Sequence, residues 1–186
     1  MPFPELYILR HGQTEWNAEN RMQGALNSPL TAKGEADAAR QGNILAGRDL
    51  RGFQFWCSPQ GRAIQTAAIA LGRIAHDIHT DDRLREIKVG DWSGLLRDTL
   101  PLPDGPDPYA LQYDMAPNGE GFQALEIRAR AFLNDLTGPA VLVTHGITSR
   151  VLRRIIAGDA ATVDVTAHGG QGCVYHLKNG RQTLLD

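Results

Sequence analysis

Short apolar runs alternate with longer amphipathic stretches along most of the chain, a pattern that predicts an α/β fold. The run Ala140–Thr144 is continuous and rich in valine, as in strands that are buried on both faces. The last run is interrupted by Asn179-Gly180, a pair typical of the type I′ turn of a β-hairpin. Strands are predicted at Leu6–Arg10, Gln54–Ser58, Ile78–Thr80 and Ala140–Thr144, and in a hairpin over 173–185.

Helices are predicted between these strands, where apolar and small residues recur at helical spacing. They cover 31–46, a stretch from Ser58-Pro59 through Leu71, 122–136 and 147–157. Thr31 is expected to cap the first helix, because its hydroxyl can accept a hydrogen bond from a free backbone N–H. Ser58 is expected to cap the second, with Pro59 at its first helical position.

The segment 94–121 differs from the rest of the chain. It has few periodic apolar positions and holds five prolines, at 101, 103, 106, 108 and 117. We therefore predict one domain over residues 1–186 with an irregular insert at about 94–121. Tyr109, Tyr113 and Phe122 are candidates for a lid that selects the leaving group, with packing of a surface loop as the alternative.

Composition excludes some classes of function and leaves others open. The formal charge of −2 argues against general nucleic-acid binding, although a few converging arginines can still form a pocket for a small anion. The sequence contains no stretch of eighteen apolar residues, the length needed to span a membrane, and the first residues do not resemble a signal peptide. We therefore expect a cytoplasmic protein with no membrane or nucleic-acid partner. His76 and His79 have a spacing that could hold a metal, but no third ligand is evident, so no metal site is predicted.

Three of the predicted strands lead directly into residues suited to phosphate chemistry. The first ends in Arg10-His11-Gly12, the second is followed by Arg62 one turn into its helix, and the third ends in Thr144-His145-Gly146. Ligands of open α/β sheets bind beyond the carboxyl ends of the strands, beside helix N-termini that attract anions. We expect both histidines and both arginines to meet at this edge of the sheet.

This set of residue types fits phosphoryl transfer. A neutral imidazole can attack phosphorus, arginine forks can neutralise the transferring group, and a second imidazole can donate to one of its oxygens. A carboxylic acid is then needed to protonate the leaving oxygen. Any one of these residues alone is more simply a structural or solvated side chain. The hypothesis depends on their joint occurrence.

The segment Leu9–Gly34 closely resembles the opening motif of the histidine phosphatase superfamily, the phosphoglycerate mutase-like proteins. The resemblance continues, in the family's order, over most of the chain, in the blocks Ser58–Ala67, Arg83–Gly94, Pro117–Phe122 and Val143–Leu152. It implies a three-layer α/β/α sandwich around a mostly parallel sheet, with no metal and no organic cofactor. It departs from the common family pattern at Gly121, where a serine is frequent, and at Ile147, where a second glycine is common.

The resemblance also implies a role for six residues. The expected assignments are Arg10, Asn17, Arg62 and His145 for phosphate binding, His11 as nucleophile, Glu86 as proton donor and His145 as a second catalytic residue. The block from Leu84 to Gly94 is similar to that of the phosphatase members, which favours hydrolysis of a small phosphorylated substrate. A mutase reaction and a non-catalytic binding role remain as alternatives, and the oligomeric state stays open.

Overall fold

A six-stranded sheet lies at the centre of the computed structural model, which describes residues 3–105, 107–158 and 170–186. Its strand order is β3-β2-β4-β1-β5-β6. The strands are β1 (Leu6–Arg10), β2 (Gln54–Cys57), β3 (His79–Thr80), β4 (Ala140–Thr144), β5 (Val174–Lys178) and β6 (Arg181–Leu185). The four strands from β3 to β1 pair in parallel, whereas β5 is antiparallel to both of its neighbours. The predicted α/β fold with a mostly parallel sheet is confirmed.

The helices of the described part fall mostly where helical spacing predicts them. They are α1 (Glu15–Ala18), α2 (Ala32–Ala46), α3 (Gly61–Leu71), α4 (Pro108–Met115), α5 (Gly121–Asp135) and α6 (Gly146–Ala157), with short 3₁₀ turns at Asp82–Leu84, Gly90–Trp92 and Arg97–Thr99. Thr31 caps α2 as expected, since its side chain accepts the backbone N–H of Gly34. The hairpin turn has positive φ at both Asn179 and Gly180, as a type I′ turn requires.

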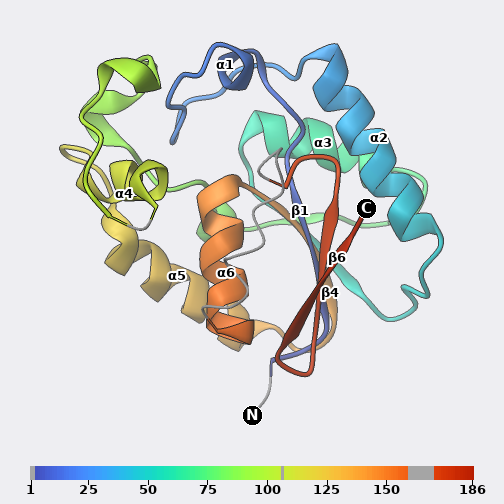
Figure 1. The fold of residues 1–186 in the computed structure, drawn as a ribbon. Helices are drawn as coiled ribbons and strands as arrows, with labels where there is room; N and C mark the ends of the chain where they lie inside the picture. The colour runs from blue at the N-terminus through green and yellow to red at the C-terminus, as the bar shows by residue number, and fades with distance from the viewer. Residues whose placement is uncertain (1–2, 106, 159–169) are drawn as a thin grey trace.

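Helices cover both faces of the sheet, with α2 and α3 on the right in Figure 1 and α5 and α6 on the left. Alternation along β1 divides the core between the two layers. Leu6 and Ile8 belong to the cluster that includes residues of α5 and α6, whereas Tyr7 and Leu9 belong to the cluster that includes residues of α2 and α3. The helices therefore bury both faces of the sheet's central strand.

Two local predictions were wrong. The helix after β2 begins at Gly61 with Gln60 in the capping position, while the Ser58 hydroxyl lies 2.7 Å from His145 Nε2 and accepts Gln60 N–H at 3.3 Å. The insert at 94–121 is not irregular throughout, since residues 108–115 form α4. Asp107 caps this helix through Ala110 N–H, and Pro108 occupies its first turn, where the missing proline N–H costs nothing.

The carboxyl ends of β1 and β4 lie side by side at the upper edge of the sheet in Figure 1. Arg10 is in register with Thr144, and His11 N–H donates to the Thr144 carbonyl at 2.9 Å. Behind this edge the backbone at Gly12 contacts that of α2. A Cβ on Gly12 would lie 2.1 Å from the Gly34 carbonyl oxygen, so a side chain at this position is excluded.

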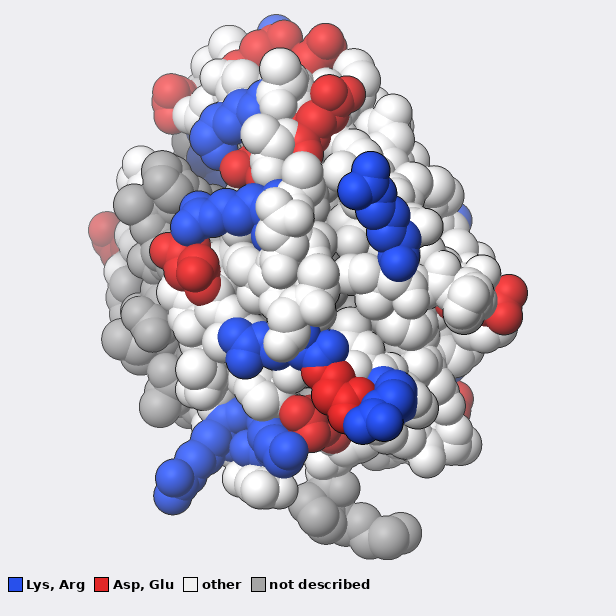
Figure 2. Space-filling model, turned by 90° about the vertical axis from the view of Figure 1, so that its right-hand side faces the viewer, with Lys and Arg blue, Asp and Glu red and all other residues white. Residues whose placement is uncertain are grey.

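Charges are interleaved on the surface that includes α2, where Figure 2 shows blue and red side chains next to one another. Ion pairs in and after this helix include Lys33 with Asp37 at 3.1 Å and Arg51 with Asp49 at 2.5 Å. This face therefore carries side chains of both charges. Within the described residues, none of the helices combines the length and the apolar character needed to cross a membrane.

Candidate active site

His11 lies directly after β1 and is almost fully buried, at 3% exposure. Its Nδ1 lies 2.8 Å from the Gly12 carbonyl oxygen, which can only accept, so Nδ1 carries the proton. The other ring nitrogen, Nε2, keeps its lone pair and accepts a hydrogen bond from Arg62 Nε at 3.2 Å. Gly12 N–H is held in turn by the Thr66 hydroxyl at 3.1 Å. The local hydrogen bonds thus fix His11 in the tautomer that a nucleophile at Nε2 needs.

Arg62 reaches this point from the first turn of α3 and is 1% exposed. Besides the bond to His11, its two terminal nitrogens donate to backbone carbonyls, to Leu26 at 2.6 Å and to Gly24 at 3.0 Å. These bonds fix the guanidinium plane while each terminal nitrogen retains a second N–H for an anion. Burial lowers the pKa of Arg62 to about 10, so the side chain stays positively charged at neutral pH.

His145 follows β4 and faces His11, with ring centroids 5.2 Å apart. Its Nε2 lies 2.7 Å from Ser58 Oγ, whereas its buried Nδ1 has no hydrogen-bond partner in the described part of the chain. A buried polar atom without a partner is unfavourable unless a ligand satisfies it. If the Ser58 hydroxyl donates to Nε2, the proton of the neutral ring is on Nδ1 and can bind a phosphate oxygen.

Both imidazoles are neutral at neutral pH. Burial is the main cause that lowers the pKa of His11 well below its usual value, and the positive charges of Arg62 and Arg10 act in the same direction. The same causes lower the pKa of His145. Removing a cation-forming group from water and placing it among other cations disfavours its charged form. The site therefore provides an unprotonated ring nitrogen, His11 Nε2, that accepts a hydrogen bond from a fixed guanidinium.

Glu86 is held against the N-terminus of α6. Its Oε2 accepts Ile147 N–H at 3.1 Å, and its Oε1 accepts Thr148 N–H at 3.0 Å and Ile87 N–H at 3.1 Å. The Thr148 hydroxyl also lies 3.0 Å from Oε1. Oε2, with a single donor among the described residues, is the oxygen that has room for a proton. The carboxylate is close enough to Arg62 to raise the pKa of that guanidinium.

Gln60 is a polar residue of the site that the sequence analysis did not select. It is 4% exposed, and its Oε1 accepts the backbone N–H of Glu86 at 2.7 Å. Its Nε2 donates to the carbonyls of Gly24 at 2.9 Å and Ala25 at 3.2 Å. This one side chain joins the loop that holds Arg62 to the segment that carries Glu86. The one feature of the sequence that could have pointed to Gln60 is its position directly before Gly61-Arg62.

The remaining two predicted phosphate ligands, Arg10 and Asn17, lie at the start of α6 and in α1. The Arg10 guanidinium lies against the start of α6, about 3.3 Å from the point where a side chain on Gly146 would begin. Asn17 is the third residue of α1, and its Oδ1 accepts Thr14 N–H at 3.1 Å and the Gln171 amide at 3.1 Å. Those bonds occupy the carbonyl oxygen of Asn17 and leave its amide nitrogen as the donor.

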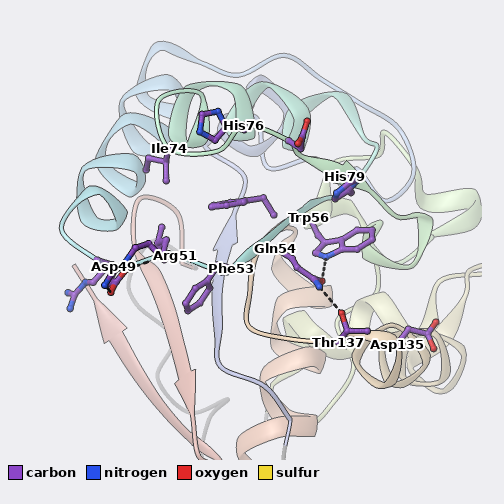
Figure 3. Close-up of a pocket in the computed structure, with 15 residues that line it drawn as sticks. Asp49, Arg51, Phe53, Gln54, Trp56, Ile74, His76, His79, Asp135 and Thr137 are labelled. Atoms are coloured by element: carbon purple, nitrogen blue, oxygen red, sulfur yellow. Dashed lines mark hydrogen bonds and ion pairs between the residues drawn. The ribbon is translucent and has the colours of Figure 1, made fainter.

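A cavity of about 890 Å³ lies away from these residues, beside the start of β2. Figure 3 shows Trp56 next to His79, and Gln54 between Trp56 and Thr137. Its lining includes none of the six predicted site residues. His76 and His79 are both exposed here, and the described residues contain no group of three or more metal-ligating side chains around them.

Comparisons with known proteins agree with this geometry. A sequence profile described as the histidine phosphatase superfamily (branch 1) matches residues 6–184. A relative from Enterobacter sp. (strain 638), named "Probable phosphoglycerate mutase GpmB", is 35% identical over 168 residues, which are 83% of this chain and 75% of the relative.

Solved structures resemble the whole chain. A phosphoglycerate mutase from Thermus thermophilus is 33% identical, with a TM-score of 0.73 over 98% of each chain. A protein from Escherichia coli K-12, named a "putative alpha-ribazole-5'-P phosphatase", is 26% identical, with a TM-score of 0.71 over 98% of this chain and 94% of the other. From the extent of the profile match and the shared fold, we conclude that the chain belongs to the histidine phosphatase superfamily, branch 1.

Proposed function

We propose that this protein hydrolyses small phosphomonoesters through a phosphohistidine formed on His11. The observation that carries the proposal is the state of the His11 ring: Nδ1–H is bound to the Gly12 carbonyl, so Nε2 is the unprotonated nitrogen that would attack phosphorus. Arg62 donates to that same nitrogen, which places a guanidinium where the transferring phosphoryl group would bind. A nucleophile beside fixed cationic donors is what phosphoryl transfer requires.

In the first step, His11 Nε2 forms a bond to phosphorus while the bond from phosphorus to the ester oxygen breaks. Arg10, Arg62 and the Nδ1–H of His145 hold the phosphoryl oxygens, together with the Asn17 amide. Protonated Glu86 transfers its proton from Oε2 to the departing oxygen, so the product leaves as an alcohol.

In the second step, water attacks the phosphohistidine and the P–N bond breaks. The Glu86 carboxylate accepts the proton of that water, which restores the starting protonation state and releases inorganic phosphate. A mutase would differ only here, because a retained alcohol would replace water as the acceptor. Relatives carry names of both kinds, so support for hydrolysis comes from the phosphatase-like block around Glu86.

The test is release of phosphate from p-nitrophenyl phosphate by wild type and by His11→Ala, with excess EDTA present. His76→Ala is the matched control, since it removes an exposed histidine that lines the remote cavity. We expect EDTA-resistant turnover by wild type and by the control, and none by His11→Ala. Turnover that EDTA abolishes would refute the metal-independent mechanism.

The competing reactions are separated in a second assay. Wild type is incubated with 3-phosphoglycerate, and both inorganic phosphate and 2-phosphoglycerate are measured. Hydrolysis predicts phosphate as the main product, whereas rapid formation of the isomer without phosphate would establish the mutase alternative. A folded protein with neither activity, and with no alkali-stable phosphate on His11, would favour the non-catalytic role.

A further inference from the structure

A small cavity of about 180 Å³ lies where α4 of the insert meets the start of α6. Four arginines line it: Arg10, Arg97, Arg150 and Arg153. Its lining contains no aspartate or glutamate among the described residues, and its other walls include Tyr109, Tyr113 and Tyr175. A space of this size holds about six water molecules, or a carboxylate or phosphate with a short carbon chain.

Arg97 contributes a positive charge that neutral groups hold in place. Its terminal nitrogens donate to the Tyr113 hydroxyl at 2.6 Å and to Gln112 Oε1 and the Tyr109 carbonyl at 3.3 Å each. Its guanidinium lies 5.0 Å from the centre of the Tyr113 ring. No carboxylate in the described part of the chain forms an ion pair with it. The direct contacts of the fork are with neutral groups, and the Asp107 carboxylate acts on it from beyond ion-pair distance.

Arg150 approaches the same cavity from the second turn of α6. It pairs with Asp107 through one terminal nitrogen at 2.6 Å, which anchors the side chain to the residue that caps α4. The side chain is about a quarter exposed, at 26%. Its remaining N–H groups can donate to a ligand in the cavity, because a guanidinium has five donors.

The lining of the cavity includes residues that belong to, or lie next to, the candidate active site. Arg10 lines it and is also a proposed ligand of the phosphoryl group. Gly146 and Ile147 line it too, directly after His145. On the opposite wall, Tyr113 is close enough to Arg62 to affect the pKa of that guanidinium. The cavity therefore lies beside the candidate active site and shares Arg10 with it.

We propose that Arg97 and Arg150 form a subsite for a second anionic group of the substrate, a carboxylate or a second phosphate. Planar guanidinium forks bind both kinds of anion bidentately, and tyrosine walls allow a short carbon chain to pass between them. The preferred substrates are therefore compact phosphomonoesters with two anionic groups. This inference rests on the proposed function in one respect, namely that the first phosphoryl group binds at His11.

The test compares substrates that differ in the second anion alone. One pair is 3-phosphoglycerate and glycerol 3-phosphate, and the other is fructose 1,6-bisphosphate and fructose 6-phosphate. Wild type is expected to prefer the two-anion member of at least one pair by about 10- to 100-fold in kcat/KM. The pair that shows the preference identifies the second group as carboxylate or phosphate.

Arg97→Gln and Arg150→Gln are expected to reduce that preference about ten-fold or more, mainly through KM. Arg97→Lys, which keeps the positive charge but lacks the planar guanidinium, should retain part of the preference for the two-anion substrate. The matched control is Arg130→Gln, which removes an exposed arginine of α5 that pairs only with Glu126 among the described residues. It should keep the wild-type preference. Because a misfolded insert would weaken both members of a pair alike, the ratio separates binding from a structural effect.

Two outcomes would overturn the inference: no preference in wild type for either pair, or equal losses for both members in the arginine variants. Turnover of p-nitrophenyl phosphate without such a preference would leave the hydrolase intact and refute the subsite alone. If no substrate is turned over, calorimetric binding of the same compounds to wild type and Arg97→Gln tests the subsite directly. Equal affinities within each pair would then refute it.

Discussion

Acid should destabilise this protein through its two buried histidines. His11 and His145 are neutral in the folded chain, and their pKa values are lowered mainly by burial. In the unfolded chain a histidine has a pKa of about 6.5. Below that pH the unfolded state binds more protons than the folded state, so the free energy of unfolding falls as the pH falls toward the folded pKa.

The magnitude follows from this difference in proton uptake. Between pH 7.5 and pH 5.5, a histidine that stays neutral in the folded state lowers the free energy of unfolding by about 1.4 kcal/mol. His11 and His145 together would contribute about 2.8 kcal/mol. That is a substantial share of the stability of a typical domain, which is roughly 5–15 kcal/mol.

The assay is urea unfolding at both pH values for wild type, His11→Asn and His145→Gln. The asparagine side chain at position 11 can still donate a hydrogen bond to the Gly12 carbonyl, as His11 Nδ1 does. The glutamine side chain at position 145 can still place a polar atom near the Ser58 hydroxyl. Each variant should lose about 1.4 kcal/mol less than wild type between the two pH values. His76→Asn, which removes an exposed imidazole, is the control and should keep the wild-type difference. A His11→Asn difference equal to that of wild type would show that His11 is not held neutral, and would refute the reasoning.

Three further substitutions test the supporting contacts. Ser58→Ala should lower kcat/KM for p-nitrophenyl phosphate about ten-fold, because the ring of His145 loses the bond that fixes its tautomer; a change under two-fold would contradict this. Gln60→Leu should lower the free energy of unfolding by about 1–3 kcal/mol in urea and reduce kcat, because Glu86 N–H and the Ala25 carbonyl lose this partner and the Gly24 carbonyl keeps only Arg62 as a donor in the described part of the chain. Full activity in a stably folded variant would exclude a positioning role. Phe132→Ala, at 1% exposure, should cost about 3–5 kcal/mol, and a loss below about 1 kcal/mol would mean that the core refills the space.

Much of the fold could be predicted from local patterns. The apolar runs at Leu6–Arg10 and Ala140–Thr144 are strands with the expected bounds, and Thr31 caps its helix as expected. These features depend on periodicity and on side chains that act within one turn. The helix at 108–115 was missed because the five prolines of segment 94–121 were interpreted together as a sign of irregular structure. Asp107-Pro108 is itself a helix start, with a capping carboxylate followed by proline at the first position.

The candidate site was predicted in part. The placement of His11 and His145 together follows from two parallel strands that end in register, which the sequence suggested. The contacts of Gln60 and those of the Glu86 carboxylate with α6 were not predictable, because they join segments 26 to 62 residues apart. Which backbone N–H groups a buried side chain meets is decided by packing, and no local pattern encodes it.

The order of strands in the sheet has a consequence for how the protein folds during synthesis. β1 emerges first from the ribosome, yet its two neighbours in the sheet, β4 and β5, come from residues 140–144 and 174–178. Both edges of this apolar strand therefore stay unpaired until most of the chain has been synthesised, and unpaired strand edges are prone to aggregation. His11 N–H also binds the Thr144 carbonyl, so the proposed nucleophile acquires its geometry only when β4 pairs. Nascent chains that end before β4 should be inactive and should depend on chaperones for solubility.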